Sequence, residues 1–154
     1  MRDILLNLQK LFRGSMRLKY VLNKSIVISE LDIKAANIPY SEMPAIIIMP
    51  GPEETLNSSR LTRLVEYRVE ILAINYYEDE DIIITGNKKT IGILKYIEDI
   101  KSSLSDEPKL FGTCLGWLHD SLRIVPGFFE TLKPFTIARK IFVSYKGVEM
   151  QNTG

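Results

Sequence analysis

The stretch that decides the fold is "LTRLVEYRVEILAINYY", residues 61–77. Successive residues of an extended strand point to opposite faces. One face of this stretch is apolar throughout, at Val65, Tyr67, Val69, Ile71 and Ala73. The other face changes from Glu66, Arg68 and Glu70 to Leu72, Ile74 and Tyr76. The pattern predicts a long strand that begins in solvent and ends beneath other elements.

The preceding stretch, "PAIIIMPGPEE", residues 44–54, is a second strand candidate. Residues 45–49 are apolar on both pleat faces, which indicates a strand covered on both sides. Residues 50–61 are rich in turn formers and predict a long surface loop or a flexible hairpin tip. A phosphate-binding loop is disfavoured, because Pro50 and Pro52 have no N–H to donate and the two glutamates would repel phosphate.

Two segments have the apolar periodicity of amphipathic helices. The first covers residues 3–13, and Gly14 is placed to end it. The second runs from about Asn87 to about Ser103, with Thr85 as a plausible N-cap. An acidic turn, "EDED" at residues 78–81, separates it from the long strand.

The remaining segments complete the predicted order. The sequence predicts extended segments at residues 18–29, 113–125 and 135–145. It predicts connectors at residues 105–112 and 126–134. The order is then α-β-β-β-α-β-β, with strands in runs rather than alternating with helices. This favours an α+β fold: a mostly antiparallel sheet of about five strands packed with two amphipathic helices. We expect one domain over residues 1–147 and a flexible polar tail over residues 148–154.

Bulk composition narrows the class of protein. The 154 residues are 45% apolar and carry a formal net charge of +1, which is ordinary for a globular domain and does not predict a strongly basic nucleic-acid binder. The single cysteine, Cys114, excludes a disulfide within the chain and favours a reducing, cytoplasmic origin. We see no signal peptide and no apolar run long enough for a membrane span.

None of the candidate chemical motifs is convincing. "HDS", residues 119–121, has triad residue types, but neighbours on a strand cannot converge, and the only histidine of the chain cannot form a histidine-based metal cluster. "TGNKKT", residues 85–90, sits before a predicted helix but lacks phosphate-loop glycine spacing. "EDED" lacks the spacing of a calcium loop. We therefore expect no catalytic residue, no cofactor and no metal, and so no enzyme.

Other residues suggest assembly. Arg60, Arg63 and Arg68 cluster near the predicted loop, and arginine and aromatic residues are the types enriched in interface cores. Taken singly, each is more often core or solvated surface. The candidate exposed aromatic residues are Tyr76, Tyr77, Trp117, Phe128 and Phe129.

A family resemblance rests on several segments together. An opening helix is followed by "PAIIIMPGPE", by "EYRVEILAINYY" with its acidic turn, by "KKTIGILKYIEDIKSSL" and by "ARKIFVSYKG". In order, length and texture, residues 1–147 resemble a tail terminator (tail completion) protein of a long-tailed bacteriophage, prophage or phage-like particle. The family has no invariant motif. The connector "PGFFETLKP" is more apolar than the resemblance implies.

The resemblance implies a virion structural protein without catalysis or cofactor. It implies a hexameric ring in the neck that is assembled in the host cytoplasm, caps the tail tube and offers a docking surface to the head connector or stopper protein. Genome DNA would pass through the lumen without specific contact, which a near-neutral charge permits. The residues expected to touch a ring neighbour or the tube are Pro50, Gly51, Pro52, Glu53, Glu54, Arg60 and Arg63.

Two other functions are compatible with the sequence. The protein could be a different neck component, such as a head completion or connector adaptor protein. It could also be a small anion- or nucleotide-binding enzyme that uses residues 85–90.

Overall fold

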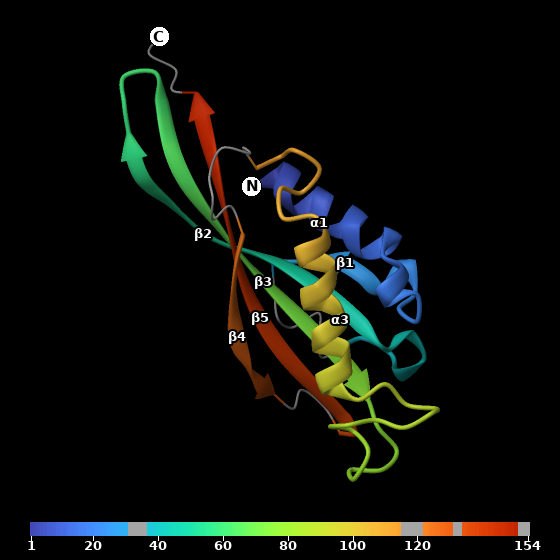
Figure 1. Cartoon of the computed structure of the whole chain (residues 1–154). Coiled ribbons are helices and arrows are strands. Elements are labelled where there is room, and N and C mark those ends of the chain that lie inside the picture. The colour runs from blue at the N-terminus through green and yellow to red at the C-terminus, as the bar shows by residue number, and fades with distance from the viewer. Residues whose placement is uncertain (31–36, 115–121, 131–133, 151–154) are drawn as a thin grey trace.

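The computed structural model describes residues 1–30, 37–114, 122–130 and 134–150. These residues form two α-helices and a five-stranded sheet (Figure 1), which confirms the α+β class. The elements are α1 (Arg2–Gly14), β1 (Ile26–Ile28), β2 (Ala45–Ser58), β3 (Thr62–Tyr76), α3 (Ile93–Asp106), β4 (Leu122–Glu130) and β5 (Thr136–Met150). Short 3₁₀ turns lie at Met16–Leu18, Asn23–Ser25 and Tyr40–Glu42. No helix in these ranges is both long and apolar enough to cross a membrane.

The sheet is built around the predicted long strand. Its order is β1-β2-β3-β5-β4, so β3 lies at the centre. β3 pairs antiparallel with β5 along its whole length, from Thr62 opposite Met150 to Tyr76 opposite Thr136. Only β1 runs parallel to its neighbour, β2, and the other described pairs are antiparallel.

Both helices cover the same face of the sheet (Figure 1) and form the main core with it. The five alternate apolar residues of β3 that the sequence places on one face all lie in this core. Leu8 of α1 and Ile100 of α3 are completely buried there, and each such side chain contributes roughly 1.5–3 kcal/mol of burial free energy. The Tyr96 hydroxyl donates to the carbonyl of Ala45 at 2.7 Å, which links α3 to β2.

A second, smaller core lies on the opposite face of the sheet. Segment 37–44 contributes Ile38 and Met43, and these pack with the alternate residues of the strands. The strand residues are Ala45, Ile47, Met49, Leu72, Ile74 and Ala138. This second cover confirms that residues 45–49 are buried on both faces, and it explains why the outer face of β3 turns apolar after Glu70.

The expected loop after Met49 is wrong, because β2 continues to Ser58. Pro50 pairs with Val69 and Glu53 with Tyr67, and the register shift between them is a β-bulge that holds Gly51 and Pro52. A Cβ on Gly51 would lie 2.7 Å from the Arg68 carbonyl oxygen, so the bulge brings two backbones too close for any side chain. Pro50 is therefore a paired strand residue and Pro52 lies in the bulge, so neither proline forms a corner.

The second helix begins six residues later than expected. Its N-cap is Gly92, not Thr85, and it ends at Asp106. Residues 85–92 form a tight loop instead, in which the Gly86 amide donates to the Ile82 carbonyl and the Asn87 amide to the Thr90 carbonyl. Gly86 has φ +78°, and a Cβ on Gly92 would lie 2.4 Å from the Gly86 nitrogen. Two glycine backbones in contact produce this loop, which apolar periodicity cannot reveal.

Four further segments differ from expectation. The segment 18–29 is mainly turns, some of them 3₁₀, with β1 only at Ile26–Ile28. Residues 126–130, expected as connector, belong to β4 with a register shift between Pro126 and Phe129. β5 runs to Met150, so residues 148–150 pair with β3 instead of starting a tail. In the expected strand 113–125, Thr113 and Cys114 lie in a turn, and residues 115–121 lie outside the described residues.

Candidate functional site

The end of the sheet farthest from the helix α3 N-terminus projects past both helices (Figure 1). We call it the arm and define it as residues 53–64 of β2, the turn and β3, together with residues 148–150 of β5. Residues 52–61 are exposed without interruption. The side chains of the turn therefore add little to the core of a single copy.

Side chains near the base of the arm hold its strands together. Glu149 accepts hydrogen bonds from the Tyr67 hydroxyl and from Arg63, whose Nε lies 2.7 Å from Glu149 Oε2. The bond from Tyr67 and then that from Arg63 hold the pKa of Glu149 below its ordinary value. Burial raises the pKa of Tyr67, and its ring lies 3.1 Å from the position of a Cβ on Gly147. The arm is thus an ordered extension of the sheet.

The residues predicted as an interface all lie on or at the base of this arm. Gly51 and Pro52 form the bulge at its base, and Pro50 is the paired residue just before it. Glu53 and Glu54 follow in β2, and Glu54 Oε2 lies 2.8 Å from Arg68 Nη2. Arg60 occupies the turn, and Arg63 is the second residue of β3. The structure brings Glu54, Arg63 and Glu149 into internal pairs, and the interface role of the whole set stays a prediction.

The tip of the arm also exposes apolar side chains. Leu56 is 41% exposed, Leu61 58% and Met150 76%. Leu56 falls in a second register shift, between Thr55 and Asn57, which removes it from regular pairing with β3. Apolar residues grouped at the end of a projecting element are typical of protein-contact surfaces.

A second surface lies at the opposite end of β3. Tyr40, Tyr76, Tyr77 and Phe135, here called the aromatic cluster, line a shallow cavity of about 330 Å³ together with Glu78. The Tyr77 and Phe135 rings meet edge to face with centroids 6.3 Å apart.

Backbone contacts hold the aromatic cluster in place. The Tyr77 amide donates to the Phe135 carbonyl at 2.8 Å, and the Tyr40 hydroxyl donates to the Pro134 carbonyl at 2.6 Å. Phe135 is 63% exposed although its φ is +60°, a conformation that a bulky residue rarely adopts.

Sequence reasoning found only half of the aromatic cluster. It singled out Tyr76 and Tyr77 but not Tyr40 or Phe135. A signal was present, because both missed residues directly follow a proline, at Pro39 and Pro134. Of the other aromatic candidates, Trp117 lies outside the described residues, and the side chains of Phe128 and Phe129 are not described.

The loop at residues 85–90 does not provide an open anion site. The first two amides of α3, at Ile93 and Leu94, donate to the carbonyls of Ile83 and Ile84 at 2.8 and 3.2 Å. A helix N-terminus binds an anion through such amides, and here two of them are already used. Lys88 and Lys89 are exposed, which agrees with the interpretation that they are solvated.

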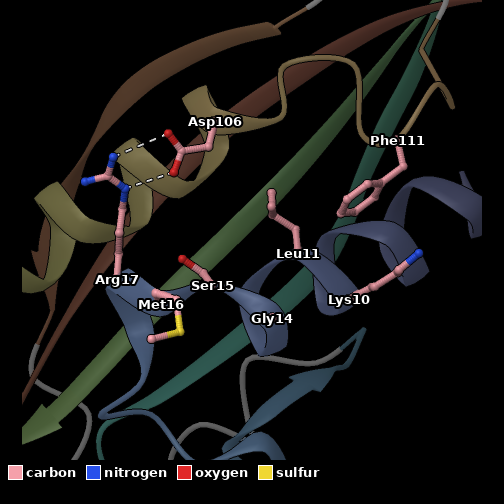
Figure 2. A pocket seen from close by; sticks show the side chains of 8 residues that line it. All are labelled: Lys10, Leu11, Gly14, Ser15, Met16, Arg17, Asp106 and Phe111. Carbon is pink, nitrogen blue, oxygen red and sulfur yellow. Dashed lines mark hydrogen bonds and ion pairs between the residues drawn. The ribbon is translucent and has the colours of Figure 1, made fainter.

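A larger pocket of about 670 Å³ lies where α1 ends against the loop after α3 (Figure 2). Its rim carries an Arg17–Asp106 ion pair of 2.9 Å, and Lys10 Nζ lies 4.6 Å from the centroid of the Phe111 ring. Because these charged groups are already engaged and the rest of the lining is mainly apolar, the pocket lacks the placed polar groups that orient a small ligand.

The remaining candidates for chemistry are limited. Cys114 is buried, and burial raises the pKa of its thiol to about 11, so the reactive thiolate is scarce at neutral pH. The "HDS" residues 119–121 lie outside the described residues. Within the described ranges, no group of three or more His, Cys, Asp or Glu side chains is placed to hold a metal ion.

No protein-family model matches the chain, and no curated protein matches it significantly. The function must therefore be inferred from the arrangement of the arm and the aromatic cluster.

Proposed function

We propose that the protein is a virion structural protein, a tail terminator that forms a ring, in the simplest case a hexamer, on the tail tube of a bacteriophage or phage-like particle. The ring stops tube growth and offers a docking surface to the head connector or stopper protein. The protein acts without a cofactor, and DNA passes through the lumen without specific contact. Its place is the neck of the particle, after assembly in the host cytoplasm.

The observation that carries this proposal is the arm. It extends the sheet past both helices (Figure 1). Its tip exposes Leu56 of β2 and Leu61 of the turn, while the pairs around Glu149 keep the strands ordered. An ordered projection with an apolar tip contributes little to the stability of one copy. It is well suited to contact another protein. The α-β-β-β-α-β-β order, which is also the basis of the family resemblance, agrees with this reading.

The nucleotide-binding alternative has less support. Backbone amides in and just after the candidate loop already donate to carbonyls of the same chain. The close backbone contact between Gly86 and Gly92 explains why both positions are glycine, without a bound phosphate. A thermal-shift titration with nucleotides checks this directly. A ligand at 100 times its Kd would add about 2.7 kcal/mol of stability, and we expect no shift.

Tube binding tests the proposal. Tail tubes assembled from the tube protein of the same particle are mixed with the purified chain and imaged in negative stain. We expect capped ends and tubes that stop growing. The double variant Leu56→Ser, Leu61→Ser should cap poorly, whereas Leu94→Ser, which changes a leucine of 39% exposure on α3, should cap normally.

Two results would contradict this function. A chain that leaves the tubes uncapped and growing is not a terminator. A chain that binds the isolated head connector but never the tube is another neck component, the alternative that the sequence also permits.

A further inference from the structure

We propose that Arg60 and Leu61 at the tip of the arm dock onto the aromatic cluster of a second copy of the chain. The contact rests on the proposed function, since it supplies the subunit contact that a ring requires. The resemblance already places Arg60 in an interface, and the structure adds the surface that receives it.

The aromatic cluster has the chemistry of a cation receptor. The faces of Tyr and Phe rings attract a guanidinium or ammonium group within about 6 Å of the ring centroid. Glu78 adds a carboxylate to the same cavity, and it is exposed with no ion pair to any described residue. The nearby Asp79 is engaged locally, because its Oδ1 accepts from the Asp81 amide at 2.9 Å. Of the acids in this turn, Glu78 is the one that lines the cavity.

The tip of the arm supplies a matching guest. Arg60 is exposed at the turn and has no ion pair within the described ranges, unlike Arg63 and Arg68, which pair with Glu149 and Glu54. Leu61, its neighbour, is 58% exposed. A planar guanidinium stacks on aromatic rings and pairs with a carboxylate. The adjacent leucine covers apolar ring surface.

The two surfaces cannot meet within one copy. Thr62 next to the tip and Tyr76 of the cluster are the two ends of β3. A strand rises about 3.4 Å per residue, so these ends lie roughly 48 Å apart along the strand. A contact between different patches on successive copies is heterologous, and it generates a ring when the rotation closes. The positions of the two surfaces thus suit the geometry of a ring.

Charge reversal with mixing tests the contact. Arg60→Glu places two acids opposite each other, and Glu78→Arg places two cations opposite each other. We expect each variant alone to need about tenfold more protein for half-assembly, equivalent to about 1.4 kcal/mol. An equimolar mixture should assemble as the wild type does, because one variant's reversed arm meets the other variant's reversed cluster. The matched controls are Arg123→Glu and Glu98→Arg, which change exposed residues near the start of β4 and in the middle of α3.

Cross-linking keeps the proposal testable if assembly in solution is weak. In a Cys114→Ser background, Arg60→Cys protein is mixed with Glu78→Cys protein and treated with a short bis-maleimide. We expect a covalent dimer only in the mixture that contains both positions, and Arg123→Cys in place of Arg60→Cys should abolish it.

The outcomes separate this contact from the proposed function. No 60–78 product, in solution or on tail tubes, together with no rescue on mixing, overturns the contact even if the chain caps tubes. A chain that gives the 60–78 product but never binds a tube has the contact and lacks the tail-terminator function.

Discussion

Gly51→Ala should destabilise the fold, because the bulge at the base of the arm leaves no space for a side chain. A Cβ there would lie 2.7 Å from the Arg68 carbonyl oxygen and 3.1 Å from its carbonyl carbon. Both atoms belong to the backbone of β3, which is paired on both sides and cannot move freely. Forcing atoms into a packed site typically costs about 1–3 kcal/mol. We expect a loss of about 2 kcal/mol.

Urea unfolding followed by circular dichroism measures this loss. With a denaturant dependence of about 2 kcal/mol per molar urea, the midpoint should fall by about 1 M. Gly14→Ala is the matched control, because nothing lies within 4 Å of its Cβ position. At the end of α1 this change should be neutral or stabilise by up to about 1 kcal/mol.

Equal midpoints for Gly51→Ala and Gly14→Ala would refute the reasoning. Residues 50–58 would then form the flexible loop that the sequence predicts, rather than a strand held against Arg68. A lowered midpoint with an unchanged denaturant slope would support the bulge, since the slope reports the surface exposed on unfolding.

Three further predictions follow from other sites. Tyr145→Phe should stabilise the protein by about 1 kcal/mol in the same assay, because the buried Tyr145 hydroxyl has no hydrogen-bond partner among the described residues; a loss of stability would show that a partner exists. The pKa of Glu149 is lowered in the fold by its bonds from Tyr67 and Arg63, so its contribution is present above the ordinary value of 4.5 and is lost as the pH falls through the lowered pKa. Because the Glu149 side chain is partly exposed, the effect is small. Glu149→Gln should make the free energy of unfolding depend less on pH between pH 3 and 6, and an unchanged pH dependence would contradict this. Cys114, whose thiol pKa is raised to about 11 by burial, should react with a thiol reagent at pH 8 only as fast as the protein opens, so urea should accelerate the reaction, and immediate labelling in buffer would show an accessible thiol.

The sequence predicted helices and strands well wherever buried side chains recur with the period of the element. The long strand was placed at residues 61–77 and is Thr62–Tyr76, and the first helix was placed at residues 3–13 and is Arg2–Gly14. In both, apolar side chains recur with the period of the element because one face packs on the core. The change of face along β3 likewise predicted the second core.

The predicted ends of helices and strands were wrong where backbone contacts, rather than apolar side chains, decide the structure. Pro50 and Pro52 are turn formers in isolation, yet the bulge lets β2 pass through them and keep its pairing with β3. The start of α3 moved to Ile93 because Gly86 and Gly92 pack backbone to backbone. The local amino-acid composition does not reveal either contact.

The sequence by itself determined the α+β class, the element order, the long strand and the face of that strand that lies in the core, because each depends on the periodic burial of side chains along one segment. Only the tertiary structure decided that residues 50–58 extend a strand into an arm. It also decided that Tyr40, Tyr76, Tyr77 and Phe135 meet at the other end of β3. Both features join residues far apart in the chain, and their positions depend on strand register and backbone contact, which no single segment encodes.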